Sequence, residues 1–469
     1  MKKKILILGA GPSGLSVAYG AKKNNSEIDI KVIEKKNQVG GLAGSFKSGD
    51  DFIDYGPHRL SVQNSIIKSI AESLLESNLI INKSQHGVEF NDKLYQFPPK
   101  IKDLLNIKSI LIIYKLVISY ISGKFHWFIN RYKNENFNEY ILHQFGNFFL
   151  NEIAKPMSNK VWGDSDKIDP NFVTQRFSMV KPFEIFKQFI FPSPKLNPST
   201  FYYPKFGGFQ AIWDAMSEKL KNNNVDICLN SFPTKIIIEN EKIIKIQYKE
   251  DDNIKTIDTL NTSVVSTIPI LNLVKIIDLK SEKLVEMAKK IRVRSMYLVV
   301  MKFNQNQTLP YRTLIFPEKK FIFNRIFEQN LYSQDSVKTD RSVIVADITY
   351  DRNDKNYEDE NKILEKTTEQ ISKLDYIDMT NLINIELKKV EFAYVSPEIE
   401  TRKNFDLIRK ELEKIDNLHL LGRFGVGDYD NSDYAIINGL NLSDLLTSKI
   451  TSIDYSLKKS KSTDSKIVG

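Results

Sequence analysis

The stretch KILILGAGPSGLSVAYG, residues 4–20, decides the fold. Its apolar beginning predicts a buried parallel strand, and its end has the spacing of a helix. Between the two, Gly9, Gly11 and Gly14 complete a G-x-G-x-x-G pattern. Glycines at these places permit a tight turn, a close backbone approach to a pyrophosphate and close packing of helix on strand. The stretch therefore predicts a dinucleotide-binding β-α-β unit.

An acidic residue and a second glycine pair extend this pattern. The segment IDIKVIEKK (28–36) predicts the next strand and ends near Glu34, whose carboxylate would accept hydrogen bonds from ribose hydroxyls. Gly40 and Gly41 follow in the next loop. Such a loop would direct backbone N–H groups back toward the pyrophosphate. In FAD enzymes that resemble glutathione reductase in fold, such a glycine pair follows the acidic residue, and this resemblance implies a second element on the phosphate side of the same site.

Strand, glycine and helix patterns return twice later in the chain, which predicts a discontinuous nucleotide-binding domain. This domain is expected to comprise residues 1–84, 201–275 and 410–455. Residues 85–200 and 276–409 are expected to form a mixed α+β substrate domain with a helical part. The polar tail, 456–469, is predicted to be disordered.

Several local predictions follow from composition and turn residues. Residues 62–83 have a helical pattern, and 100–190 read as mostly helical. The segment GVEFNDKLYQFP (87–98) predicts a hairpin around Asn91 and Asp92, and SFKSGDDFIDYG (45–56) predicts another.

The overall composition limits the kinds of binding partner that are expected. The net charge is +9, but the basic residues are scattered, and the sequence has no motif typical of nucleic-acid binding. The only cysteine, Cys228, excludes an internal disulfide and fits a cytoplasmic protein. No metal-ligand spacing is present, so we expect no metal site. A small-molecule substrate is the expected partner, and the oligomeric state stays open.

One apolar stretch approaches a membrane span. In LLNIKSILIIYKLVISYISG (104–123), Lys108 and Lys115 interrupt the apolar run. A bilayer span needs about 20 predominantly apolar residues, so we predict a helix packed within the helical part. The alternative is a peripheral membrane contact with the lysines at the headgroups.

Several segments carry a family resemblance. IEKKNQVGGLAGSF (33–46) resembles the second flavin motif of the amine oxidase, protoporphyrinogen oxidase and phytoene desaturase group. DYGPHRL (54–60) is similar to a Gly-Pro-His element of UDP-galactopyranose mutases. Residues 137–177 resemble a segment shared by both groups, and LLGRFGVGDYDNSDYAIINGL (420–440) resembles their last flavin motif. The resemblance implies an α/β fold of the glutathione-reductase type, with FAD as cofactor.

Two departures keep the substrate open. Leu42 stands where many members of the group have arginine after the glycine pair. The Asp-x-x-Tyr-Phe element of the mutases is not found, and FYYPKFGGFQAIWDAM (201–216), which resembles a block of the oxidase-like group, stands in its place.

The resemblance and the glycine pattern together assign cofactor-binding residues. A helix beginning near Asp433 to Ala435 would face the flavin, where its dipole would stabilise the anionic reduced ring. The residues expected to bind FAD are Gly9, Gly11, Pro12, Ser13, Gly14, Glu34, Lys35, Gly40, Gly41, Leu42, Ala43, Gly56, Pro57, His58, Arg59, Ile236, Gly422, Arg423, Asp433, Tyr434 and Ala435.

Three residues are candidates for catalysis. His58 follows a rigid Gly-Pro corner and would contact the flavin ring, with a structural hydrogen-bonding role as the alternative. Arg325, in IFNRIFEQ (322–329), matches a mutase arginine that binds the substrate diphosphate, and the alternative is an ordinary salt bridge. Trp162 lies in the Lys-x-Trp-Gly core of the shared segment, where it either lines the substrate cavity or packs in the core.

The sequence thus predicts an FAD-dependent oxidoreductase of the amine oxidase and protoporphyrinogen oxidase-like group. The first alternative is a mutase-like isomerase acting on a nucleotide sugar. A second is a non-catalytic binding protein like the GDP-dissociation inhibitors, which share the fold. The complete set of Gly9, Gly11, Gly14 and Glu34 argues against this second alternative.

Overall fold

The computed structural model describes residues 3–97, 107–130, 136–172, 200–279 and 281–447. The tail for which disorder is predicted, 456–469, lies outside these ranges, as do residues 100–106, 131–135 and 173–190 of the segment expected to be helical.

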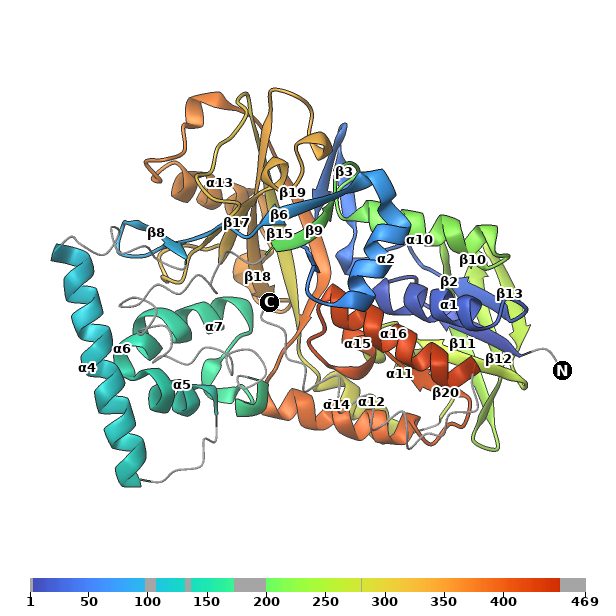
Figure 1. The fold of residues 1–469 in the computed structure, drawn as a ribbon. Coiled ribbons are helices and arrows are strands. Elements are labelled where there is room, and N and C mark those ends of the chain that lie inside the picture. The colour runs from blue at the N-terminus through green and yellow to red at the C-terminus, as the bar shows by residue number, and fades with distance from the viewer. Residues whose placement is uncertain (1–2, 98–106, 131–135, 173–199, 280, 448–469) are drawn as a thin grey trace.

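A five-stranded parallel sheet organises the N-terminal part of the fold (Figure 1). In spatial order its strands are β10 (Asp226–Cys228), β2 (Asp29–Ile33), β1 (Lys4–Leu8), β14 (Thr262–Ser266) and β20 (Leu418–Leu420). One face is covered by α1 (Pro12–Asn24), α2 (Ser65–Leu75), α10 (Gln210–Asn222) and α16 (Ser432–Thr447). The sheet therefore draws its strands from three separated stretches of the chain.

Strand β1 is buried on both faces, as its apolar run predicts. Ile5 and Ile7 pack with the helices α1 and α10. Leu6 and Leu8 pack into a second core on the opposite face. That core is closed by α11 (Ile270–Ile276), α12 (Glu282–Lys289), α14 (Ile399–Leu412) and an antiparallel sheet of β11 (Ser231–Glu239), β12 (Lys242–Glu250) and β13 (Asn253–Asp258).

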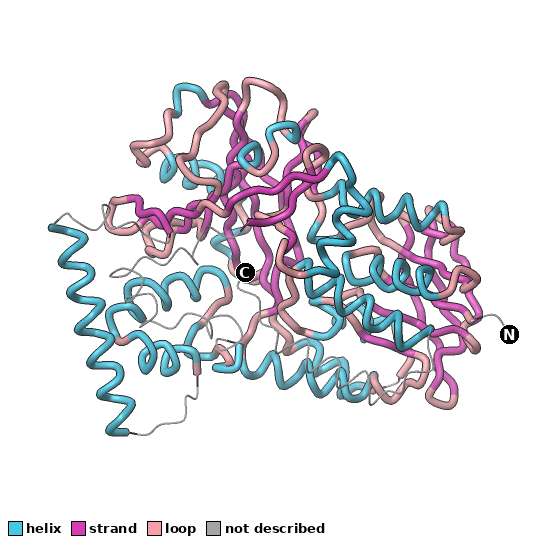
Figure 2. Tube along the Cα trace, viewed as in Figure 1, coloured by secondary structure: helices cyan, strands magenta, loops and turns pink. Residues whose placement is uncertain are grey.

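A seven-stranded mixed sheet forms the second large unit. Figure 2 shows its long strands in the middle of the view. In spatial order its strands are β19 (Leu382–Val395), β15 (Val293–Phe303), β18 (Ser342–Asp351), β17 (Arg325–Glu328), β16 (Thr313–Ile315), β7 (His86–Glu89) and β8 (Leu94–Phe97). Leu298 and Val300 of β15 share the core of α1 and α10, whereas Tyr297 and Val299 face a separate core beside α13 (Glu360–Ile371). The two large sheets are thus joined by one continuous core.

Two predicted hairpins are confirmed, and one predicted helix is partly wrong. The hairpins are β7–β8 and the pair β3 (Ser45–Ser48) and β4 (Asp51–Asp54). The helix expected over 62–83 ends at Leu75, because Leu79–Lys83 forms strand β6. Strand β6 pairs with β9 (Thr200–Pro204), whose other neighbour is β5 (Leu60–Ser61). This tertiary pairing overrides the local helical pattern.

The helical part lies at the far end of the molecule from the parallel sheet (Figure 1). It contains α4 (Ile107–Asn130), α5 (Phe137–Phe145), α6 (Asn147–Phe149) and α7 (Lys155–Val161). A small core of aromatic and aliphatic side chains joins α5 to Leu150, Ile168 and Phe172. Within the described ranges, none of the helices is both long enough and apolar enough to cross a bilayer.

Candidate functional site

The turn between β1 and α1 gives each glycine of the pattern a physical role. Gly9 has φ +105°, which an L side chain rarely adopts. A Cβ on Gly14 would overlap the Gly9 carbonyl oxygen, so this glycine is required for packing of α1 on the turn. A Cβ on Gly11 would meet no heavy atom within 4 Å. The turn is therefore closed at Gly9 and Gly14 and open at Gly11, where a ligand would approach.

The second glycine pair lies directly against this turn. The Gly40 N–H donates to the Ala10 carbonyl over 2.8 Å. A Cβ on Gly41 would lie 3.3 Å from the Gly11 Cα. The loop is anchored from behind, because the Trp213 indole N–H donates to the Ala43 carbonyl over 2.7 Å. The two glycine segments, residues 9–14 and 40–41, thus form one backbone surface.

Glu34 connects the same elements. Its Oε2 accepts the Ala10 N–H at 2.7 Å, and its Oε1 accepts the Lys36 N–H at 2.9 Å. Glu34 is buried at the end of β2. A carboxylate has about four lone-pair sites, so these two bonds leave acceptor capacity for a ribose hydroxyl.

The last motif of the sequence also reaches the glycine turn. A Cβ on Gly422 would lie 3.3 Å from the Ser13 Oγ. Helix α16 begins at Ser432, and the Asp433 carboxylate accepts the Ser61 N–H at 3.2 and 3.3 Å. Burial raises the pKa of Asp433 to about 6. Asp433 thus ties the start of α16 to the strand that follows His58.

The Gly-Pro corner places His58 in a largely buried position. Its ring stacks on Phe209, with ring centroids 5.1 Å apart, and its side chain is 22% exposed. Burial first, and then the positive charges of Arg423 and Arg325, lower the pKa of His58 to about 3. The buried Nδ1 has no hydrogen-bond partner among the described residues and lies 4.0 Å from the Asp54 Oδ2. His58 is therefore a neutral imidazole with an unused polar atom.

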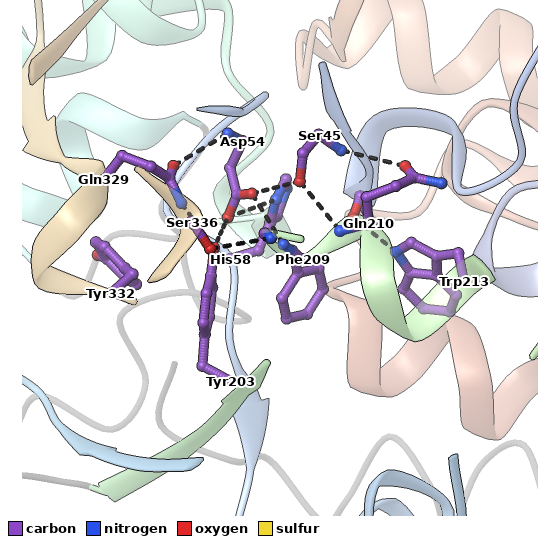
Figure 3. A network of polar contacts seen from close by, with 12 residues as sticks. Ser45, Asp54, His58, Tyr203, Phe209, Gln210, Trp213, Gln329, Tyr332 and Ser336 are labelled. Carbon is purple, nitrogen blue, oxygen red and sulfur yellow. Dashed lines mark hydrogen bonds and ion pairs between the residues drawn. The ribbon is translucent and has the colours of Figure 1, made fainter. Parts of the chain in front are cut away.

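Asp54 is the centre of a buried polar network beside His58 (Figure 3). Its carboxylate accepts hydrogen bonds from the Ser45 hydroxyl at 2.6 Å, the Tyr203 hydroxyl at 2.7 Å and the Phe209 N–H at 3.0 Å. Burial raises the pKa of Asp54 to about 6, against the opposing effect of these bonds. The network links β4, β9 and the start of α10, and so fixes the strand that leads into the corner. This role was not predicted from the sequence, although Asp54 stands at the end of an alternating strand two residues before Gly56.

Arg325 lies beside the same corner. A Cβ on Gly56 would be 3.7 Å from an Arg325 guanidinium nitrogen. The Arg325 Nε donates to the Asp347 Oδ2 over 2.7 Å, and a second guanidinium nitrogen contacts the same oxygen. Asp347 is fully buried, whereas 25% of the Arg325 side chain is exposed. Burial lowers the pKa of Arg325, but the Asp347 carboxylate raises it and prevails, so the guanidinium stays charged.

Lys160, from the Lys-x-Trp-Gly core, holds the segment that precedes Arg325. Its ammonium donates to the carbonyls of Phe316, Glu318 and Phe323, the last two over 2.9 and 3.1 Å. Burial lowers the pKa of Lys160 to about 7, although nearby carboxylates oppose the shift. No role was predicted for this lysine from the sequence. The hydrogen bonds of the Lys160 ammonium fix the loop between β16 and β17, and β17 begins at Arg325.

A row of aromatic rings connects the helical part to Arg423. Trp162 packs edge-on against Phe172 at 4.9 Å, and Phe172 packs against Tyr429 at 5.6 Å. Tyr429 stacks on Tyr394 at 5.6 Å and lies under the Arg423 guanidinium, whose carbon is 4.7 Å from the ring centroid. A small hollow opens between Phe172, Arg423 and Tyr429. Trp162 therefore belongs to the packing behind this hollow, two ring contacts away from Arg423.

The remaining predicted residues are spread around these elements. Lys35 lies over the Phe232 ring at 5.9 Å, and Arg59 donates to the Ser84 hydroxyl over 3.2 Å. The Ile236 side chain is fully buried in the second core, so it is not accessible to a ligand. The Ile236 carbonyl accepts the Asp278 N–H. Pro12, Tyr434 and Ala435 lie at the first turns of α1 and α16. No group of metal-ligating side chains occurs in the part of the chain that the structure describes.

Comparison with known proteins agrees with this architecture. Residues 7–74 match the family described as NAD(P)-binding Rossmann-like domain. Coproporphyrinogen III oxidase of Staphylococcus aureus is 25% identical over 272 residues, which are 53% of this chain and 58% of that protein. The match therefore spans less than two thirds of the curated relative.

Two solved structures resemble nearly the whole chain. Reduced UDP-galactopyranose mutase has a TM-score of 0.79 at 19% identity, with 95% of this chain and 93% of that chain covered. A putative protoporphyrinogen oxidase from Exiguobacterium sp. 255-15 has a TM-score of 0.69 at 17% identity, with 95% and 99% covered. The chain has the fold that these two structures share. The fold class predicted from the sequence is thereby confirmed. At these sequence identities, the similarity to the two structures concerns the fold alone.

Proposed function

We propose that this protein is an FAD-dependent oxidoreductase of the amine oxidase and protoporphyrinogen oxidase-like group. The observation that carries the proposal is that Gly41 lies directly against Gly11, while the Cβ side of Gly11 stays open to a ligand. A nucleotide-binding turn alone serves nicotinamide and flavin cofactors equally well. A second glycine segment against that turn would add backbone N–H groups on the pyrophosphate side, and the corner that holds His58 would receive the flavin ring.

The residues present fit FAD on two counts. The site offers a backbone surface at Gly11 and Gly41 that a Cβ would obstruct, and it holds an unpaired buried nitrogen on His58. The N–H groups of Ser13 and Gly14 at the start of α1 would bind the pyrophosphate, and Glu34 would bind the ribose. Gly422 and the first turn of α16 would border the flavin. When bound, FAD supplies two-electron acceptor chemistry.

The chain's own residues would orient the substrate and control charge. His58 is neutral at physiological pH, so it offers one N–H donor and one acceptor nitrogen without adding a third positive charge beside Arg325 and Arg423. The two guanidinium groups would attract an anionic substrate. Carboxylate-bearing substrates, including the coproporphyrinogen named for the Staphylococcus aureus relative, match this charge.

A binding experiment tests the cofactor. The purified protein, mixed with FAD and then freed of excess ligand, should retain the visible absorbance bands of flavin, and excess NAD should not displace them. Gly11→Ala should lose the bands, because the new methyl group occupies the side that faces the ligand. Absence of flavin bands in the wild type would contradict the proposal and leave the non-catalytic binding protein as the better hypothesis.

A mutase-like isomerase is the second candidate, and the cationic, aromatic surroundings of the corner favour it. Arg325, Arg423 and the stacked pair Tyr394 and Tyr429 suit a diphosphate with an attached ring. Turnover assays discriminate the two. Oxygen-dependent oxidation of coproporphyrinogen III supports the oxidoreductase. Conversion of UDP-galactopyranose only in the presence of dithionite supports the mutase.

A further inference from the structure

Helix α4 presents its large apolar side chains away from the protein. Seven of them are strongly exposed, from 47% for Ile118 to 73% for Phe128. The set, named here the outer stripe, is Ile110, Leu111, Tyr114, Ile118, Ile121, Phe125 and Phe128. At about 100° per residue, all seven fall within an arc of about 100° on one side of the helix.

The opposite side of α4 makes the contacts with the rest of the chain. The buried positions of its described part are small, namely Ser109, Ser119 and Gly123. The Ser119 hydroxyl accepts the Phe148 N–H at 2.7 Å, and a Cβ on Gly123 would overlap the Leu142 carbonyl oxygen. The usual amphipathic arrangement is therefore inverted, with small residues facing inward and large apolar residues facing outward.

The charges along α4 favour an anionic partner. Residues 107–130 contain lysines but no aspartate or glutamate. Lys115 is exposed next to the outer stripe, and the Lys124 ammonium donates to Gln144 on α5 over 2.9 Å. A basic helix with aromatic and aliphatic side chains on one face is the form that lies in the interface of an anionic bilayer.

A second copy of the chain is a weaker occupant. A helix of 24 residues is about 36 Å long and about 10 Å wide, so one face offers roughly 360 Å². A stable protein interface buries about 800 Å² on each partner. A bilayer needs no matching surface, and Figure 1 shows α4 at the edge of the molecule, on the side away from the parallel sheet.

We propose that the outer stripe of α4 docks the protein on the surface of an anionic membrane. The helix would lie in the plane of the interface, with the stripe among the acyl chains and Lys115 at the headgroups. A membrane-bound position would bring the helical part next to a lipid phase. This docking does not depend on the proposed function.

Vesicle flotation with the full-length protein tests the proposal. The wild type should float with vesicles of phosphatidylcholine and phosphatidylglycerol, and less with phosphatidylcholine alone. Ile118→Glu with Ile121→Glu should reduce the bound fraction on anionic vesicles about tenfold or more. The matched control is Ile254→Glu with Leu260→Glu, which adds the same charge at side chains that are 71% and 54% exposed in and beside β13. Lys115→Gln should weaken binding about fivefold at low salt.

The control determines how the result is interpreted. Equal loss in both double variants would show a general charge effect and overturn the assignment to α4. A wild type that does not float with anionic vesicles would also overturn it. Size-exclusion chromatography tests the alternative occupant, a second copy of the chain. If the wild type is a dimer that does not bind vesicles, and the α4 variant is a monomer, the outer stripe is a contact between copies and the proposal is overturned. Circular dichroism and thermal unfolding verify that each variant is folded.

Discussion

The glycine turn at residues 9–14 and the corner at residues 56–59 belong to one candidate site but are built differently. At the turn, backbone atoms and missing side chains make the surface: a Cβ on Gly41 would lie against the Gly11 Cα, and a Cβ on Gly11 would project into open space. At the corner, side chains from distant strands converge, with Asp54 and Arg325 on either side of His58. The first kind of surface is specified by local sequence, and the second only by the tertiary fold. Substitutions at the two places should therefore have different effects on stability and on FAD binding.

Arg325→Ala should give the largest effect, because it leaves the fully buried Asp347 carboxylate without its cation. The loss of one member of a buried ion pair costs about 3–5 kcal/mol in the free energy of unfolding. Urea denaturation of the wild type and the variant measures this cost. The double variant Arg325→Gln with Asp347→Asn should recover much of the loss. If Arg325→Ala loses less than about 1 kcal/mol, the pair is not the support of the corner that its geometry implies.

Gly14→Ala and Gly11→Ala separate packing from ligand access at the turn. The Gly14 variant forces a Cβ against backbone and should lose about 1–3 kcal/mol or more of unfolding free energy. The Gly11 variant meets open space and should leave the stability of the cofactor-free protein within about 0.5 kcal/mol, while FAD affinity falls. Thermal unfolding and flavin titration of both variants measure the two properties. Equal stability loss in both would show that the turn has no open side.

The same difference explains what the sequence could predict. Gly9, Gly11 and Gly14 were assigned because each role depends on neighbours within a few residues, and strands such as Lys4–Leu8 follow from apolar runs. The partner of Arg325 could not be predicted, because Asp347 lies on a different strand and its burial depends on the sheet order. Strand Leu79–Lys83 was mistaken for helix for the same reason, since its pairing with Thr200–Pro204 is distant in sequence.

Tyr203→Phe probes the polar network behind the corner with a smaller change. It removes a hydroxyl that donates to Asp54 and accepts from the Gln329 amide at 2.9 Å. Leaving these buried groups without that partner should cost about 1–2 kcal/mol. Urea unfolding measures the loss. The same experiment on Tyr19→Phe, whose hydroxyl has one exposed contact at 3.5 Å, is the matched control and should show almost none.

His58 gives the most specific prediction, because its effect depends on pH and its pKa shifts in the opposite direction from that of Asp54. The folded pKa of His58 is about 3 against an ordinary 6.5, so the unfolded chain binds more protons and stability falls as the pH drops below 6.5. The folded pKa of Asp54 is about 6 against an ordinary 3.8, so its contribution rises as the pH drops from 6 toward 4. The two slopes oppose each other between pH 4 and 6.

His58→Gln removes one slope and leaves the other. The stability of the variant relative to the wild type should therefore increase as the pH falls, by about 1.4 kcal/mol per pH unit once well below 6.5. Denaturation at a series of pH values from 7 to 5 measures this difference directly, and all other titrating groups cancel in it. A difference independent of pH would mean that the pKa of His58 is the same in the folded and the unfolded protein, so that the folded imidazole becomes charged as the pH falls below 6.5. The corner would then hold a cation beside Arg325 and Arg423, which its burial argues against.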